Sequence, residues 1–536
     1  MDNVSKREQI MVLAGLMLGM LVAALDQTVV GTAMPRIVAD LGGMSLYSWT
    51  FTAYMLASTS LVPVFGKLSD IFGRRRFFLF GVVTFMVGSW LSGASQTMEQ
   101  LIIFRGIQGV GAACIMPITF AAIADIFPPA QRGRMQGLMS GVWGLASILG
   151  PIVGGYIADN LSWRWVFFVN LPVGVLAIAV AYFNLHDRPD PGLKRKVDYL
   201  GVVLLLAGLL PLLLALSLGG KDYAWESPVI LGMFIMAAVM LGLFPLVEAR
   251  AEEPLIPLSL FRNSIFTVSN INGFLIGFGM FSGMVFLPLF LQAVGGATAT
   301  NSGLLLTPMM LAVVASTNLG AQLMTRIGYR KVALGSMSVL VLGYYLLTTM
   351  DVHTTSQQAM IYMIIMGIGL GPIMPLFVIA VQNSVDYAHL GVATSAVQFF
   401  RSMGGTIGVT VLGALMASNL DSQIRQQAPE ALISLGGASR GLGEVQVLLD
   451  PSTLSRIPPS VMSFLREALA NSLHEVFVVS LTVIGAAFIV TWFLKEIPLR
   501  KTRDTAHPSV GAGLKPAPTK GHTAVALSND QRGLSE

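Results

Sequence analysis

The sequence contains very little of what catalytic or metal-binding chemistry requires. Cys114 is its only cysteine, which excludes an internal disulfide and a cysteine-rich metal site. No cluster of His, Cys and acidic residues has metal-ligand spacing, and no nucleophile–base pair is evident in the polar segments. A GxxxxGK(S/T) phosphate loop is also missing, so ATP is not the expected energy source. These absences predict a protein that is not an enzyme and needs no cofactor.

Charged residues are scarce as well. They make up 11% of the 536 residues, whereas a soluble domain carries about 25%. Hydrophobic residues account for 54%, and the 56 glycines and 26 prolines are dispersed within apolar runs, as membrane helices tolerate. Lipid must therefore cover much of the exterior. The apolar run over residues 10–30 is too long for a signal peptide and is interpreted as the first membrane helix.

Apolar runs of about 20 residues, enough to cross a hydrocarbon core of about 30 Å, recur along the chain. They predict an all-α polytopic membrane protein with about fourteen transmembrane helices, near residues 10–31, 47–66, 77–95, 101–124, 137–158, 165–185, 199–219, 228–247, 267–291, 302–324, 332–350, 360–382, 393–417 and 472–494. An even number of spans places both termini on one side. Basic residues gather on alternate loops, such as Arg74–Arg76 and Lys194–Lys196, and the positive-inside rule assigns these loops and both termini to the cytoplasm.

A weak internal repeat divides the predicted spans into two sets. A glycine and basic residues follow the second span, at Gly73 and Arg74, and again follow the tenth, at Gly328 and Arg330. Such a repeat predicts two six-helix halves with two helices inserted between them. The predicted parts are an N-terminal half over 8–186, a linker with two extra helices over 187–262, a C-terminal half over 263–498 with an outer loop at 418–471, and a disordered cytoplasmic tail over 499–536.

Five motifs, in order and at matching spans, resemble those of the major facilitator superfamily, and within it the fourteen-span drug:proton antiporters of the EmrB/QacA type. They are Leu25–Val30 with Ala33–Pro35, Gly66–Arg75, Leu101–Gly111, Gly150–Gly155 and Trp163–Gly174. Gly31, Ser69 and Ala146 stand where Asn, Ala and Gly are usual in the family. The resemblance covers roughly residues 8–500 and implies the major facilitator fold.

Asp26 is the only carboxylate well inside a predicted span. Burying an unpaired carboxylate in hydrocarbon is costly, so such acids usually face a cavity or a partner and mark proton or ion paths. Arg105 enters the fourth span at a similar predicted depth. Its guanidinium would favour the charged carboxylate, and its departure would favour the protonated one.

A pair that separates during transport could therefore couple protonation to conformation, and the resemblance gives Arg105 a similar relay role. Two alternatives stay open at this point. Asp26 could order the outer end of the first helix, close to Pro35 and Arg36, or the two residues could form a permanent ion pair that holds two helices together.

Two further motifs predict contacts between helices. In the turn after the second span, the glycines permit tight backbone geometry and the aspartate can cap a helix or pair with an arginine. The resemblance implies a latch between the half-domains there, formed by Gly66, Asp70, Gly73 and Arg74; plain cytoplasmic anchoring is the alternative.

In the fifth span, small residues allow a neighbouring helix to approach closely, and a proline can bend the helix. The residues are Gly150, Pro151, Gly154 and Gly155. The resemblance associates this motif with export, while ordinary helix packing is the alternative.

Polar and aromatic side chains on helices that would line a central cavity are the candidate substrate contacts. Amides in membrane helices equally form helix–helix hydrogen bonds, and aromatic residues equally face lipid. No carboxylate lies inside a predicted span of the second half, which puts a preference for strongly cationic drugs in doubt. The candidates are Gln27, Tyr54, Gln108, Trp143, Asn270, Asn272, Phe274, Phe278, Gln398 and Arg401.

The sequence thus predicts a proton-coupled exporter of lipophilic drugs or other amphipathic compounds, working by alternating access in the inner (plasma) membrane. The proton gradient is the expected energy source. Lipophilic small molecules, protons and membrane lipids are the expected partners, nucleic acid is not, and a monomer is the expected state. Two alternatives stay open: an exporter or flippase of an endogenous lipid or siderophore-like metabolite, and a transport-dead membrane receptor or scaffold.

Overall fold

The computed structural model describes residues 6–42, 46–127, 129–185, 196–220, 223–295, 299–386, 389–427 and 459–498. The predicted tail over 499–536 and residues 428–458 of the predicted outer loop lie outside these ranges. The side chain of Pro151 is also outside the described part of the chain.

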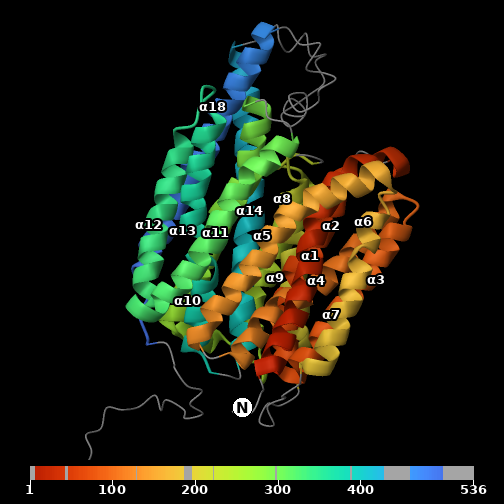
Figure 1. Ribbon diagram of the computed structural model, residues 1–536, viewed down its shortest axis with the longest axis vertical. Helices are drawn as coiled ribbons and strands as arrows, with labels where there is room; N and C mark the ends of the chain where they lie inside the picture. The colour runs from red at the N-terminus through yellow and green to blue at the C-terminus, as the bar shows by residue number, and fades with distance from the viewer. Residues whose placement is uncertain are drawn as a thin grey trace, which may run out of the picture. The chain divides into compact units, whose positions relative to one another are not determined.

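The described residues form long α-helices joined by short connections (Figure 1). Twelve of them are long and apolar enough to cross a membrane, when α6 is counted with α7 and η3 with α10. The chain is therefore a multi-pass membrane protein. Helices α2 and α5, of 26 and 32 residues, are long as well. The elements are α1 (Lys6–Leu41), α2 (Tyr47–Phe72), α3 (Arg74–Ala94), α4 (Met98–Ile126), α5 (Pro129–Asn160), α6 (Trp165–Phe168), α7 (Asn170–Asn184), α8 (Tyr199–Leu218), α9 (Pro228–Glu248), η2 (Leu258–Arg262), α10 (Ser264–Leu289), η3 (Phe290–Val294), α11 (Ala299–Ile327), α12 (Tyr329–Thr348), α13 (Ser356–Ser384), α14 (Leu390–Gln427) and α18 (Pro459–Thr491).

Each predicted span coincides with an observed helix, but the ends of one predicted loop were wrong. Helix α14 continues to Gln427 and α18 begins at Pro459, so both ends of the 418–471 segment are helical. Their extensions project at the end of the bundle opposite to the start of α1 (Figure 1). An apolar run measures only the part of a helix that lies in hydrocarbon, whereas the backbone hydrogen bonds of a helix continue equally well in water.

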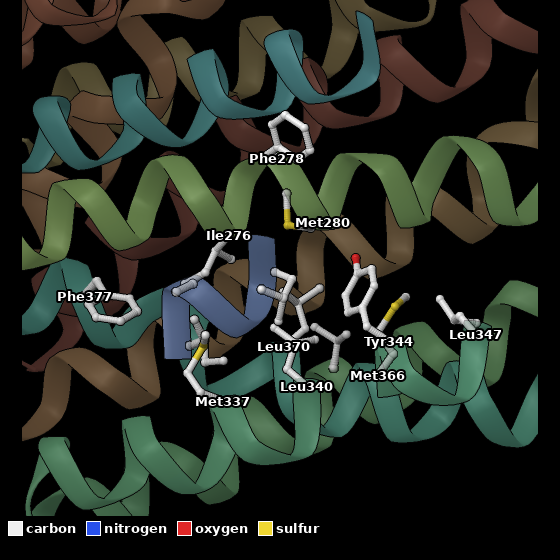
Figure 2. Close-up of a cluster of buried hydrophobic side chains, with 14 of the residues drawn as sticks. Ile276, Phe278, Met280, Met337, Leu340, Tyr344, Leu347, Met366, Leu370 and Phe377 are labelled. Atoms are coloured by element: carbon white, nitrogen blue, oxygen red, sulfur yellow. The ribbon is translucent and has the colours of Figure 1, made fainter. Parts of the chain in front are cut away.

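Two hydrophobic cores correspond to the two halves of the chain. One is formed mainly by residues 260–494 and the other mainly by residues 12–256. Figure 2 shows the first, where Met280 of α10, Tyr344 of α12 and Met366 of α13 come together. Tyr344 donates a hydrogen bond to the carbonyl of Gly279 at 2.5 Å, which satisfies its buried hydroxyl group.

The internal repeat is visible in the backbone. Gly73 separates α2 from α3 with φ 108° and ψ 145°, and Gly328 separates α11 from α12 with φ 89° and ψ 157°. Both conformations lie in a region that residues with a Cβ rarely adopt. The equivalent turns of the two halves therefore share a conformation that explains the repeated glycine.

The inserted helices α8 and α9 pack against each other and, through α8, against α2 and α14, one helix from each half. Thr52 and Ser217 form a hydrogen bond of 3.1 Å between α2 and α8. Helix α9 exposes large apolar side chains such as Ile235 and Leu246. An apolar surface of this kind is suited to contact with lipid acyl chains.

Candidate functional site

Asp26 is fully buried and accepts hydrogen bonds from three side chains. Arg105 Nη1 donates to its Oδ2 at 2.5 Å, and Gln108 Nε2 and Asn170 Nδ2 donate to its Oδ1 at 2.7 and 3.0 Å. Arg105 Nη1 also donates to Gln108 Oε1 at 2.8 Å, and Asn170 Nδ2 to Ser89 Oγ at 3.0 Å. The five side chains form a network, the Asp26 cluster, that joins helices α1, α3, α4 and α7. The charge of the carboxylate is thus balanced inside the N-terminal half.

Tyr54 of α2 closes one side of this cluster. The guanidinium of Arg105 lies over its ring, 4.4 Å from the centroid, which is a cation–π geometry. Gln27 donates a hydrogen bond to the Tyr54 hydroxyl at 3.4 Å. Two residues predicted as cavity lining, Tyr54 and Gln108, are therefore direct contacts of the ion pair.

Glycines bring the helices of the Asp26 cluster close together. A Cβ on Gly88 of α3 would lie 2.6 Å from the backbone nitrogen of Gln108, and one on Gly109 would lie 2.5 Å from the Tyr54 carbonyl oxygen. Real Cβ atoms do not approach so closely, so these positions require glycine. Gly88 therefore sets the close approach of α3 to α4, and Gly109 of the Leu101–Gly111 motif sets the spacing that lets Arg105 reach Tyr54.

The Gly150–Gly155 motif packs α5 against α1, just beyond Asp26. A Cβ on Gly150 would overlap the side chain of Thr28, and one on Gly154 would lie 2.8 Å from the carbonyl oxygen of Val29. Thr28 Oγ1 donates to the carbonyl of Ala146 at 3.0 Å. Gly155 is different, because no neighbouring atom of the described residues lies within 4 Å of the position of its Cβ.

This contrast gives a prediction. Gly154→Val should separate α5 from α1, lower the stability of the protein by about 1–3 kcal/mol and impair transport, because the backbone of Val29 cannot move aside locally. Gly155→Ala, one residue away, should leave both properties near wild type. Thermal unfolding in detergent and transport in proteoliposomes measure the two effects. Equal behaviour of the two variants would show that the motif does not act through this contact.

The Trp163–Gly174 motif holds the C-terminal end of α1 against its neighbours. Trp163 Nε1 and Arg164 Nη1 donate to Asp40 Oδ2 at 2.9 and 2.8 Å, and Arg164 Nη2 donates to the carbonyl of Ser95 at 3.2 Å. The hydrogen bonds from Arg164 and then Trp163 hold the pKa of Asp40 below its usual value. The motif thus fixes this end of α1 against α6 and the α3–α4 turn. It also places Asn170 within hydrogen-bond distance of Asp26.

The Asp70 cluster joins the two halves at the end of the bundle where α1 begins and α2 ends, named here the Asp70 end. Asp70 accepts hydrogen bonds from the backbone nitrogens of Gly391 and Val392, at 3.1 and 2.8 Å, in the first turn of α14. It also pairs with Arg74, which donates to Asp125 Oδ2 at 3.0 Å. The carboxylate of one half therefore caps the N-terminus of a helix in the other, where the helix dipole favours negative charge.

Other contacts between the halves lie at the same end. A Cβ on Gly66 would overlap Ser395 of α14, and one on Gly133 of α5 would lie 2.8 Å from the Cβ of Ala321 of α11. Lys67 extends the cluster to the segment after α9, because its Nζ lies 3.0 Å from Glu253 Oε2. This ion pair between α2 and the linker was not predicted from the sequence.

The remaining candidate cavity residues fall into different environments. Asn272 is buried and accepts a hydrogen bond from Thr491 of α18 at 3.1 Å, so it links two helices. Phe278 is buried in the core of the C-terminal half and points toward α14, where a Cβ on Gly408 would meet it (Figure 2). Trp143 packs on the core of the N-terminal half, Asn270 donates to a carbonyl within α10, and Phe274 is half-buried.

Gln398 and Arg401 are held together on α14. Arg401 donates hydrogen bonds to the side-chain oxygen of Gln398 and, at 3.6 Å, to the sulfur of Met374 on α13. Neither side chain joins the Asp26 cluster or the Asp70 cluster in the described part of the chain. They form a separate polar site in the C-terminal half.

Comparisons with known proteins agree with this architecture. Residues 16–409 match the family model of the Major Facilitator Superfamily. The chain is 40% identical over 506 residues to the Multidrug transporter protein MdtP of Bacillus subtilis, covering 91% of this chain and 93% of that protein. It is 38% identical to Multidrug resistance protein 3 of the same organism, covering 92% and 96%. The crystal structure of the human organic anion transporter MFSD10 (TETRAN) has a TM-score of 0.61 at 14% identity, over 91% of this chain and 100% of that one, which is a likeness of fold.

Proposed function

The chain belongs to the Major Facilitator Superfamily and is a transporter rather than an enzyme, and we propose that it exports amphipathic small molecules, drugs among them, in exchange for protons. The names of its bacterial relatives support multidrug efflux. The observation that carries proton exchange is the Asp26 cluster, a buried carboxylate held by Arg105 and two amides within the membrane bundle. An ionisable group in such a place is characteristic of a proton or ion path.

The amides of the cluster suit both protonation states of Asp26. An ionised carboxylate only accepts hydrogen bonds, whereas a protonated one also needs an acceptor for its O–H group. Gln108 and Asn170 now donate through nitrogen, and the Oδ1 atom of Asn170 is buried without a hydrogen-bond partner among the described residues. Rotation of the Asn170 amide would offer that oxygen to a protonated Asp26. Movement of Arg105 away from the carboxylate would then accompany protonation.

The placement of contacts between the halves supports transport by alternating access. The Asp70 cluster and the α5–α11 contact at Gly133 hold the halves together at the Asp70 end. We assign this end to the cytoplasm, because the basic loops lie there. The structure then corresponds to a state closed toward the cytoplasm. Breaking the Asp70 cluster opens the path for substrate from the inside, and re-forming it follows release to the outside.

We further propose fourteen spans of the EmrB/QacA type, with α2 and α5 added to the twelve most apolar helices. Both termini are then cytoplasmic, the membrane is the plasma (inner) membrane, and the acting unit is a monomer. Helix α8, paired with α9, contacts both α2 and α14 and would shield their junction from lipid.

Efflux driven by an imposed proton gradient tests the proposal. Proteoliposomes loaded with ethidium on the cytoplasmic side of the protein should lose it when a pH gradient is applied, and nigericin, which collapses the gradient, should stop the loss. Ethidium efflux that continues unchanged after nigericin would contradict proton exchange.

No contact among the described residues favours the alternative function, export of an endogenous lipid. The two functions nevertheless predict different effects of deleting the protein from cells. A deletion strain of a drug exporter becomes hypersensitive to many drugs, whereas loss of a lipid exporter produces an envelope defect with a normal drug profile.

A further inference from the structure

Arg401 is a membrane-embedded guanidinium that has no acidic partner among the residues that the structure describes. It lies 11 residues into α14, which begins at Leu390, and this rise of about 16 Å reaches near the middle of a hydrocarbon core of about 30 Å. Among the described residues its hydrogen bonds go to the Gln398 amide and the Met374 thioether, and no carboxylate lies within ion-pair distance. A thioether is a weak acceptor, so most of the guanidinium donors remain available.

The face of α14 that carries Arg401 is directed toward α13, whereas Phe399, Phe400 and Met403 on the opposite face pack on the core of the N-terminal half. Thr394, Gln398 and Arg401 recur at helical spacing on one face. The first of them accepts a hydrogen bond of 3.1 Å from Gln382 of α13, whose amide also donates to the carbonyl of Phe120 in the N-terminal half at 3.3 Å. Arg401 itself reaches α13 through Met374. The guanidinium therefore lies between α14 and α13, and it is only half-buried.

Gln398 adds a second unused donor. Its side chain is 6% exposed, and its Nε2 atom has no hydrogen-bond partner among the described residues. Because its oxygen is held by Arg401, the amide nitrogen is the group left to bind a ligand. A buried donor left unpaired is costly, and a guanidinium in a membrane protein normally pairs with an anion. Arg105, which pairs with Asp26, follows this rule, whereas Arg401 has no such anion in the described part of the chain.

We propose that Arg401 and Gln398 form an anion-recognising subsite, and that the exported compounds include amphipathic organic anions such as carboxylates. A carboxylate presents only acceptors and would complement these donors, while the thioether of Met374, which contacts Arg401, is apolar and adaptable enough for the body of such a compound. This substrate class rests on the proposed function as a small-molecule exporter. The Asp26 cluster would supply the proton exchange and the Arg401 subsite the selection of charge.

Three probes with one apolar body test the subsite: 1-pyrenebutyrate, 1-pyrenebutanol and pyrenebutyl-trimethylammonium. Binding is measured by fluorescence with the full-length protein in phosphatidylcholine nanodiscs, and empty nanodiscs correct for partitioning into lipid. We expect wild type to bind the anion about tenfold more tightly than the alcohol. Arg401→Gln should abolish that preference and tighten binding of the cation, and Arg401→Lys should retain part of it. Arg262→Gln, an equal charge change at an exposed residue, should retain all of it.

An anion that binds wild type no more tightly than the alcohol would overturn the subsite, and so would an Arg401→Gln variant that weakens all three probes equally. Displacement of the anion by phosphatidylglycerol, dependent on Arg401, would identify a lipid headgroup as the ligand and overturn the assignment to exported anions. The ethidium assay tests the proposed function separately. An Arg401-dependent preference for the anion without proton-driven efflux of ethidium would support the subsite and contradict proton exchange. Proton-driven efflux without that preference would support proton exchange and contradict the subsite.

Discussion

Asp26→Asn is expected to abolish uphill export while leaving downhill exchange of substrate across the membrane. Asparagine keeps the size of the side chain and can still accept the hydrogen bonds of Gln108 and Asn170, but it cannot take up and release a proton. The proton gradient can then no longer drive the transport cycle. Uphill export of ethidium and counterflow of ethidium, measured on the same proteoliposomes, separate the two activities.

The single variant also leaves Arg105 buried with no counter-ion, which costs about 3–5 kcal/mol and can unfold the protein. The double variant Asp26→Asn with Arg105→Gln removes both charges and should recover much of that stability, yet it should still lack uphill export. Asp40→Asn, the same change at an exposed position of α1, is the matched control and should keep coupling. Uphill export by the stable double variant would show that the proton path lies elsewhere.

Asp70→Ala is expected to shift the protein out of the state closed at the Asp70 end. The substitution leaves two backbone donors at the start of α14 uncapped and removes one of the two acidic partners of Arg74. A loss of about 2–3 kcal/mol from the closed state changes the ratio of states by roughly 30- to 150-fold. The transport rate should fall together with the population of the closed state, because the transport cycle requires that state.

The disulfide cross-link Gly133→Cys with Ala321→Cys reports closure directly, since these positions of α5 and α11 are in contact across the halves. Cys114 is the only native cysteine, so Cys114→Ala gives a clean background. Cross-linking should be fast with Asp70 present and much slower in Asp70→Ala. Asp125→Asn is the matched control, because Asp125 pairs with Arg74 inside one half, and its effect should be smaller. Equal cross-linking in all three proteins would rule out the latch.

The sequence was sufficient to locate the apolar helices and to place Asp26 and Arg105 at similar depth, where the structure pairs them. Apolar length locates a helix whatever its neighbours, and two charged residues at similar depth in an apolar bundle have few other partners. Even the turn glycines, Gly73 and Gly328, could be recognised from their repeat.

What the sequence could not show is which polar residue on one helix faces which on another. Gln108 was predicted to line the cavity but is bound to Asp26, and Asn170 and Ser89 were not singled out as partners of the carboxylate. An isolated amide on a membrane helix has the same sequence signature in either role. The separation of 186 residues between Lys67 and Glu253 likewise hides their ion pair.

A signal for the Asp26 cluster was nevertheless present. Gly88 and Gly109 mark where α3 and α2 approach α4, one turn or less from Arg105 and Gln108. Glycines placed beside intramembrane polar residues indicate close helix contact at that depth. They therefore predict which polar side chains are near enough to bond.

The central claim is that Asp26 exchanges protons for exported substrate, and proton movement itself is the most direct measurement of it. Proteoliposomes containing the pH indicator pyranine and a preset pH gradient receive ethidium or 1-pyrenebutyrate, and the internal pH is followed in wild type and in the Asp26→Asn, Arg105→Gln double variant. The account predicts a substrate-dependent loss of the gradient in wild type and none in the variant. Substrate movement by wild type without any change in pH would contradict it.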